Sequence, residues 1–239
     1  MNIRQLLLKL LFRHTYSSEA YVNYIRNCGV SVGDDVKIFN PREVHIDLTR
    51  PYLLKIGNRV KITSEVIILT HDFSYSVFRS VYNDIQNECS GYTVIGDNCF
   101  LGMRSVIMPG VTLGKNCIVA TGAVVTHSFP DGCVLAGSPA KKICTLDVLY
   151  ERRKQRQVED AFRLVNIIRN ELHREPTISE MGSFYPLFLP RIEGILKKEG
   201  VRTKISGDVE KEIYETFYST QPLFDGFEDF LNKAKLNKL

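Results

Sequence analysis

The sequence predicts a mainly β fold: a polygonal coil of short parallel strands with helical segments at both ends. Large aliphatic residues recur at every sixth position from Ile95 to Val125, and a smaller residue follows four positions after most of them. Asn or Gly often stands between the two, where a left-handed backbone is least costly. After residue 143 the apolar period becomes helical. A six-residue period with one corner per unit is typical of a coil rather than of a sandwich or a bundle.

Composition excludes several classes of protein. The chain has 239 residues, of which 44% are apolar and 24% charged, so it is neither a disordered chain nor a small disulfide scaffold. Lys and Arg total 31 and Asp and Glu total 27, giving a net charge of +4 without a dense basic stripe. We therefore expect no nucleic-acid partner. No apolar run approaches the roughly 20 residues that span a bilayer, so we expect no stable membrane insertion.

Each hexad is predicted to supply two inward side chains and one corner. The large inward residues are Ile95, Leu101, Ile107, Leu113, Val119 and Val125; the smaller ones are Cys99, Ser105, Val111, Cys117 and Ala123; the corners are Asn98, Arg104, Gly110, Asn116, Gly122 and Ser128. Cys99 and Cys117 are 18 residues apart and would stack inside a three-sided coil. The six cysteines include no Cys-x-x-Cys pair, which favours a reducing, cytoplasmic compartment.

The same phase occurs earlier, at Val32, Ile56, Ile62 and Ile68, and is lost between Ile68 and Ile95. The gap spans 27 positions, of which one hexad accounts for six, so about 21 residues are inserted, over 72–92. The inserted loop is rich in aromatic residues and is expected to pack as a lid on a neighbouring subunit. We thus expect three parts: an N-terminal helical segment over 1–29, the coil over 30–143 with its inserted loop, and a C-terminal helical extension over 144–239.

The two ends are predicted to be helical. Residues 2–13 are expected to form an amphipathic helix rather than a signal peptide, because Lys9 interrupts the apolar run. A second helix is expected over 18–27, capped by Ser18 and stopped by Gly29. A helix with Val158, Phe162, Val165 and Leu172 on one face is expected to end at Pro176.

The C-terminal extension carries two further patterns. The basic run over 151–156 is interpreted as a solvated helix face, with a contact to an anionic glycan or phosphate as the alternative. The aromatic residues beyond 180 are expected to bury a helical subdomain against the coil or a neighbour.

The segment from about Val32 to Ile143 resembles the left-handed parallel β-helix of the hexapeptide-repeat acyltransferases. The hexads carry the resemblance, together with Thr70-His71-Asp72 before the loop and Gly137-Ser138-Pro139-Ala140-Lys141 at the end of the coil. The left-handed sense comes from this resemblance, because the period alone does not fix it. The resemblance is specifically to sugar and surface-polysaccharide O-acetyltransferases of the superfamily.

His71 is the candidate catalytic residue. In the family the matching histidine is the general base that deprotonates the acceptor hydroxyl, and a neutral imidazole suits that task near pH 7. Such a histidine needs a partner for its other ring nitrogen. Asp47, 24 residues earlier, is the candidate partner, from another face of the coil or from another subunit. His45 and Asp72 are candidate acceptor contacts, and for Asp47 and His45 a solvated polar residue on a strand is the alternative interpretation.

The resemblance also implies a site for acetyl-CoA. Lys141 and Lys142 are expected to pair with its phosphates as point charges. Four residues along the coil are assigned as further acetyl-CoA contacts by their position: Gly102, Met103, Thr121 and Thr126. Gly137 and Ser138, at the closing turn, are assigned as well. The chain has Phe100 where many relatives have Trp, and it contains no Trp.

The resemblance therefore implies an acetyl-CoA-dependent O-acetyltransferase that acts on a sugar hydroxyl in a ternary complex, as a homotrimer, and the cysteine pattern favours the cytoplasm. The five histidines lack the spacing of a three-histidine zinc site, so no metal is expected. The alternatives are an N-acetyltransferase for an amino sugar or nucleotide-amino sugar, and a non-catalytic coil that serves as a scaffold.

Overall fold

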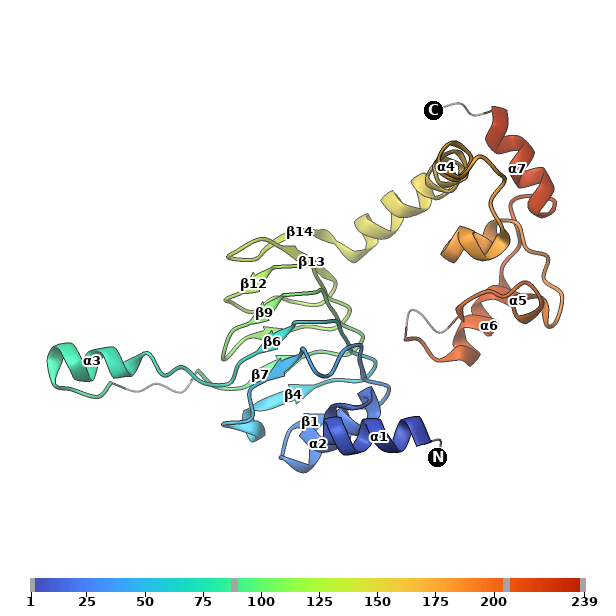
Figure 1. Ribbon diagram of the computed structural model, residues 1–239. Helices are drawn as coiled ribbons and strands as arrows, with labels where there is room; N and C mark the ends of the chain where they lie inside the picture. Colours follow the sequence, from blue (N-terminus) through green and yellow to red (C-terminus); the bar gives the residue numbers. More distant parts are fainter. Residues whose placement is uncertain (1–2, 87–89, 204–206, 237–239) are drawn as a thin grey trace. The chain divides into compact units, whose positions relative to one another are not determined.

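The structure is a computed structural model that describes residues 3–86, 90–203 and 207–236. The chain divides into two compact units, Met1–Leu149 and Tyr150–Leu239. The first unit contains the coil and the helices that precede it, and the second is helical (Figure 1).

Three sheets of very short strands form the coil. The first sheet contains β1 (Ser31–Val32), β4 (Leu54–Ile56), β7 (Thr93–Ile95) and β10 (Thr112–Leu113); the second β2 (Lys37–Ile38), β5 (Lys61–Ile62), β8 (Phe100–Leu101), β11 (Ile118–Val119), β13 (Cys133–Ala136) and β14 (Lys141–Thr145); the third β3 (His45–Ile46), β6 (Ile67–Ile68), β9 (Val106–Ile107) and β12 (Val124–Val125). Neighbouring strands are parallel, except that β14 runs antiparallel to β13. The predicted parallel β-helix with helices at both ends is confirmed.

The register of the sheets confirms the six-residue period. Ile95 pairs with Leu113, and the next two aliphatic residues pair likewise with partners 18 positions on, so successive hexads belong to the three sheets in turn. All six aliphatic residues and all five smaller residues are buried. Cys99 and Cys117 lie in this core, as predicted, whereas Cys89 lies outside the described residues. Five of the six predicted corners have positive φ; Ser128 does not.

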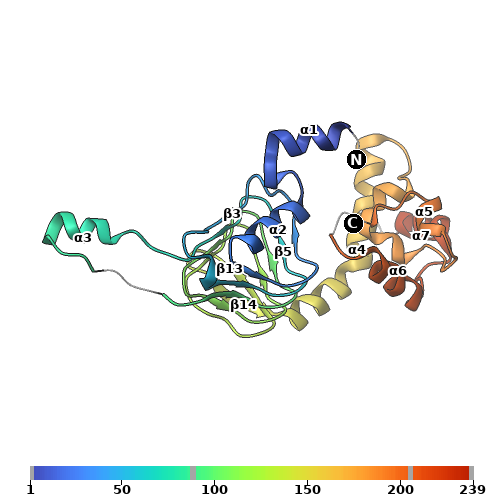
Figure 2. The ribbon, with the colours of Figure 1, turned by 90° about the horizontal axis from the view of Figure 1, so that it is seen from below.

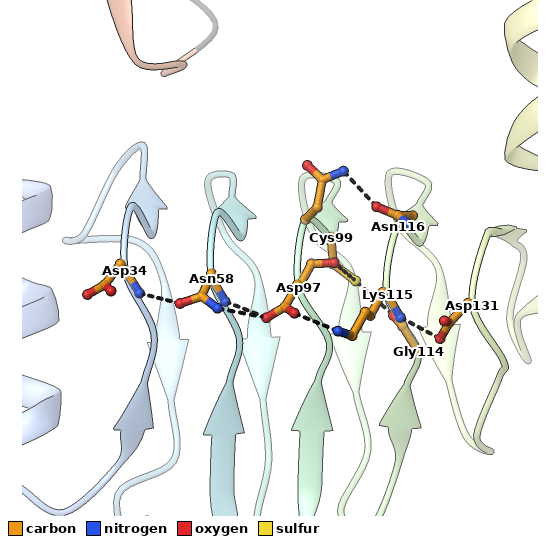
Figure 3. A network of polar contacts seen from close by, with 9 residues as sticks. Asp34, Asn58, Asp97, Cys99, Gly114, Lys115, Asn116 and Asp131 are labelled. Atoms are coloured by element: carbon orange, nitrogen blue, oxygen red, sulfur yellow. Dashed lines mark hydrogen bonds and ion pairs between the residues drawn. The ribbon is translucent and has the colours of Figure 1, made fainter. Parts of the chain in front are cut away.

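One corner of the coil is held by a ladder of polar side chains that passes from turn to turn (Figure 3). The Asn58 side chain accepts a hydrogen bond from the backbone N–H of Asp34, and its own backbone N–H donates to Asp97. Lys115 forms an ion pair with Asp97 at 3.1 Å and donates its backbone N–H to Asp131. The ladder satisfies backbone donors that the corner leaves outside the sheets.

Adjacent turns of the coil approach too closely for a side chain at some corners. A Cβ on Gly96 would lie 2.6 Å from the carbonyl carbon of Gly114, and a Cβ on Gly102 would lie 2.7 Å from the backbone nitrogen of Thr121. Neither glycine has positive φ, so close packing of the backbone requires glycine there.

The N-terminal helices are α1 (Ile3–Phe12), the short 3-10 helix η1 (Arg13–Thr15) and α2 (Ser18–Asn27), and a second 3-10 helix, η2, spans Pro51–Leu53. The predicted cap of α2 was wrong by one residue, because the Ser17 hydroxyl accepts the N–H of Ala20. The Ser18 hydroxyl instead accepts the N–H of Ile38 and ties the helix to the coil. Gly29 follows α2 with φ 105°, as predicted.

The inserted loop carries one helix, α3 (Tyr75–Tyr82), in which no residue is buried. Phe73, Val77, Val81 and Tyr82 are all more than half exposed. The insertion is confirmed by the register, because Ile56 pairs with Ile95 across it. The predicted packing on a neighbouring subunit stays a prediction.

The second unit has its own aromatic core. The elements that surround it are α4 (Leu146–Leu172), η3 (Ile178–Leu187), α5 (Ile195–Lys198), α6 (Glu210–Ser219) and α7 (Gly226–Leu236) (Figure 2). Phe188 and Phe230 are fully buried there and pack with Phe162 of α4. The predicted C-terminal helical extension is confirmed, whereas the predicted packing of its aromatic residues against the coil or a neighbour stays a prediction. Its first helix ends at Leu172, before Pro176, because His173 has φ 51°. Within the described residues no helix has the length and apolarity to cross a membrane.

Candidate active site

His71 and Asp47 lie side by side at one corner of the coil. Asp47 follows β3 and His71 follows β6, and these two strands are neighbours in the third sheet. The Nδ1 atom of His71 lies 2.5 Å from Oδ2 of Asp47. The side chain of His71 is 17% exposed and that of Asp47 is 3% exposed. The corner therefore presents an imidazole to solvent and places its carboxylate partner behind it.

Asp47 is surrounded by hydrogen-bond donors. Its Oδ2 accepts from the backbone N–H and the hydroxyl of Thr70, at 2.8 and 2.5 Å, and its Oδ1 accepts from the N–H of Thr49. Burial by itself raises the pKa of the Asp47 carboxyl, but the hydrogen bonds from Thr70 and Thr49 outweigh it and hold that pKa below its ordinary value. Asp47 is consequently a carboxylate at neutral pH.

This arrangement fixes the tautomer of His71. A carboxylate only accepts hydrogen bonds, so the proton of a neutral His71 belongs on Nδ1 and the lone pair on Nε2. The Phe73 ring packs against the imidazole at 3.9 Å between centroids and restrains its rotation. The result is an oriented base whose free nitrogen can take a proton from a hydroxyl or an ammonium group.

The other two predicted acceptor contacts lie near this pair without joining it. His45 is exposed on β3 and pairs in register with Ile67. Asp72 is exposed and accepts from the backbone N–H and hydroxyl of Ser74, and these bonds hold the pKa of its carboxyl below the usual range. Both remain proposals as substrate contacts.

Sequence reasoning missed the roles of Thr70, Thr49 and Phe73. A threonine beside the histidine was visible in Thr70-His71-Asp72, but its bond to Asp47 depends on the pairing of β3 with β6. The sequence predicts Asp47 without its position, because 24 residues separate it from His71 and regular turns of 18 residues would put the two on different corners of the coil. The residues between β3 and β6 make a turn of 22, which brings the two side chains to the same corner.

The predicted acetyl-CoA contacts fall on two corners. Gly102 and Met103 follow β8, Thr121 follows β11 and Gly137 follows β13, and these strands are consecutive in the second sheet. Ser138 adjoins Gly137, so these five residues form one column along the coil. Thr126 follows β12 in the third sheet and therefore lies on the corner that carries His71.

Part of the backbone in that column is already hydrogen-bonded. Gly102 donates its N–H to Val119, the carbonyl of Met103 accepts from Gly122, and the carbonyl of Gly137 accepts from Val124. The side chains of Met103, Thr121 and Ser138 are exposed, as are Lys141 and Lys142 on the edge strand β14. The exposed side chains of the column and the two ammonium groups remain proposals as contacts of acetyl-CoA, whereas Gly102 serves the packing of the coil.

No group of three or more His, Cys, Asp or Glu side chains that could hold a metal ion occurs among residues 3–86, 90–203 and 207–236.

Comparison with known proteins identifies the family. Residues 92–127 match the family model described as a hexapeptide repeat of succinyl-transferase. Protein CapG of Staphylococcus aureus is 39% identical over 151 residues, which is 63% of this chain and 83% of that protein. The chain belongs to the hexapeptide-repeat acetyltransferase superfamily.

Two further proteins are similar, one over a short stretch of sequence and one in structure. A 2,3,4,5-tetrahydropyridine-2,6-dicarboxylate N-acetyltransferase of Staphylococcus aureus is 42% identical over 62 residues, or 26% of each chain. A hexapeptide-repeat acetyltransferase of Vibrio cholerae aligns in structure with a TM-score of 0.43 and 21% identity, covering 60% of this chain and 89% of that one.

Proposed function

We propose that this hexapeptide-repeat protein is an acetyl-CoA-dependent O-acetyltransferase that acetylates a sugar hydroxyl in the synthesis of a surface polysaccharide. The observation that carries the proposal is the bond between Asp47 and His71. A hydroxyl has to lose its proton as its oxygen attacks a thioester, so an oriented neutral imidazole is the group this reaction requires.

Acetyl-CoA supplies the acyl carbon already activated as a thioester. His71 then acts through Nε2, which takes the proton of the acceptor hydroxyl as the new C–O bond forms. Asp47 holds the ring and stabilises the imidazolium that results, because its carboxylate stays ionised against Nδ1. The proton leaves with the thiol of coenzyme A, so the reaction needs no covalent enzyme intermediate.

The exposed column of the second sheet is the proposed position of coenzyme A, with Lys141 and Lys142 at its end for the phosphate groups. Because His71 and this column lie on different corners of one coil, we propose that the working unit is a homotrimer in the cytoplasm with sites between neighbouring coils. His45, Asp72 and Thr126 are proposed to line the acceptor side of such a site.

Transfer to nitrogen is the second candidate, favoured by the partial identity with an N-acetyltransferase. The two are separated by the release of coenzyme A thiol across a panel of sugars and amino sugars, with wild-type protein and His71→Ala. O-transfer predicts turnover with sugars that have no amino group and loss of turnover in the variant. Turnover confined to amino sugars, merely slowed in the variant, would establish N-transfer.

A further inference from the structure

The second unit contains a cavity of about 680 Å³ that the proposed reaction does not use. Its wall is formed by α4, by η3 and by the segments that follow η3 and α6. Every lining residue belongs to the range 150–239, so the cavity is complete within this unit. Its volume is in the range that holds a drug-sized ligand.

Three cationic side chains line this cavity: Arg153, Lys154 and Arg191. The guanidinium of Arg191 is held by hydrogen bonds to the carbonyls of Pro186 and Leu189 and to the carbonyl and hydroxyl of Thr220. All of these acceptors are uncharged, so none of them neutralises the positive charge of Arg191. Its carbon also lies 4.2 Å from the ring centroid of Phe217. These hydrogen bonds use four of the five N–H donors of the guanidinium, so Arg191 offers an anion its fixed positive charge and the one remaining N–H on Nη1.

The acidic residue of the cavity is already neutralised. Asp160 bonds to Arg163 at 2.8 Å and lies 4.0 Å from Arg156, and neither of these arginines lines the cavity. The three cations that do line it therefore leave a net positive site, to which an anion is attracted.

The remaining lining is aromatic and polar. Tyr150 is 59% exposed at the wall, with the Lys154 ammonium 5.7 Å from its ring centroid, and Phe184 contributes a second ring. Gln157 and Gln221 add amides that both donate and accept hydrogen bonds. Aromatic faces with amides suit a ring that is apolar on its face and hydroxylated at its edge.

We propose that this cavity binds a sugar that carries a phosphate or a carboxylate. The cations bind the charged group, Tyr150 and Phe184 cover the face of the ring, and the amides bind its hydroxyls. The inference goes beyond the proposed acetyl transfer, because it requires neither His71 nor coenzyme A. Two residues of the basic run over 151–156, Arg153 and Lys154, would thus contact a ligand, while Arg152 and Arg156 of the same run do not line the cavity.

The test is calorimetric titration of the full chain with glucose 1-phosphate, a glucuronate-containing tetrasaccharide, maltotetraose and inorganic phosphate. Arg153→Glu reverses a lining charge on an exposed position of α4, and Arg152→Glu is its matched control because Arg152 does not line the cavity. We expect at least one anionic sugar to bind, at least tenfold more tightly than maltotetraose and inorganic phosphate. Arg153→Glu is expected to weaken that binding at least tenfold, and Arg152→Glu to leave it within twofold.

Tighter binding of glucose 1-phosphate indicates a phosphorylated sugar as the ligand, and tighter binding of the glucuronate-containing tetrasaccharide indicates an acidic glycan. No binding of either one, equal binding of inorganic phosphate, or equal losses in the two variants would overturn the proposal. His71→Ala is titrated alongside and is expected to bind normally, so failure of this inference and failure of the proposed transferase activity are read separately.

Discussion

The Oδ2 atom of Asp47 lies 2.5 Å from Nδ1 of His71, although 24 residues of sequence separate them. The same oxygen accepts the Thr70 hydroxyl at 2.5 Å. One carboxylate oxygen thus joins two consecutive residues of one turn to the turn before it. The coil positions the candidate base through this carboxylate, and Phe73, at the start of the inserted loop, packs against the ring.

Asp47→Asn is expected to lower kcat by about tenfold or more, and by less than the roughly 10²–10⁴-fold loss expected for His71→Ala. The amide neither stabilises an imidazolium nor holds Nδ1 protonated, so the ring loses its fixed tautomer. The KM for acetyl-CoA should stay within twofold, because Asp47 lies on a different corner from the proposed column. Steady-state kinetics check both values, and an unchanged kcat would show that Asp47 does not position the base.

Asp47 should also make stability depend on pH. Its folded pKa is lower than that of an unfolded Asp, about 3.9, so its contribution is fully present above that value and is lost as the pH falls through the folded pKa. Wild-type protein should therefore lose more stability than Asp47→Asn below about pH 4. Urea unfolding at pH 7, 4.5 and 3 measures the difference, with Asp35→Asn at an exposed corner as the control. Parallel pH profiles for wild type and Asp47→Asn would refute this prediction.

The coil should tolerate a methyl group at some glycines and not at others. Gly96→Ala puts Cβ 2.6 Å from the backbone of Gly114, and overpacking of this kind costs up to about 3 kcal/mol. Gly122→Ala meets no atom within 4 Å and suffers only the strain of φ 71°, about 1 kcal/mol. Urea unfolding of the two variants should rank Gly96→Ala as the less stable. The reverse order would mean that close approach of the turns does not control these positions.

The two lysines of β14 should contribute to the binding of acetyl-CoA and not to the chemical step. Lys141→Ala combined with Lys142→Ala is expected to raise the KM for acetyl-CoA several-fold and to leave kcat within twofold. The effect should shrink with added salt, because exposed charges are screened. Lys197→Ala with Lys198→Ala, a second pair of adjacent lysines at the end of α5, is the matched control. Equal KM values for the two double variants would remove the lysines from the proposed donor site.

The coil is well predicted by the sequence because the burial of apolar side chains imposes its six-residue period. Three sheets need one aliphatic side chain each per turn, so the spacing of Ile95, Leu101 and Ile107 is enough to reveal the three faces. The site is less predictable. His71 stands out at the root of the insertion, but its contact with Asp47 depends on an early turn of 22 residues that no repeat announces.

The helices at the two ends of the chain are also only partly predictable from the sequence, because their details depend on tertiary packing. Ser17 and Ser18 are both good caps, and only the packing of α2 on the coil decides that Ser18 bonds to Ile38 instead. The aromatic residues beyond 180 indicate a buried core without indicating its partners, because that core is assembled from segments far apart in the sequence.

The most direct test of the account is the pre-steady-state rate of acetyl transfer to a sugar hydroxyl in wild type and in His71→Ala, with coenzyme A affinity measured in parallel. If His71 is the general base, transfer to oxygen is lost in the variant while coenzyme A binds with unchanged affinity. Transfer to oxygen at the wild-type rate in His71→Ala would contradict it.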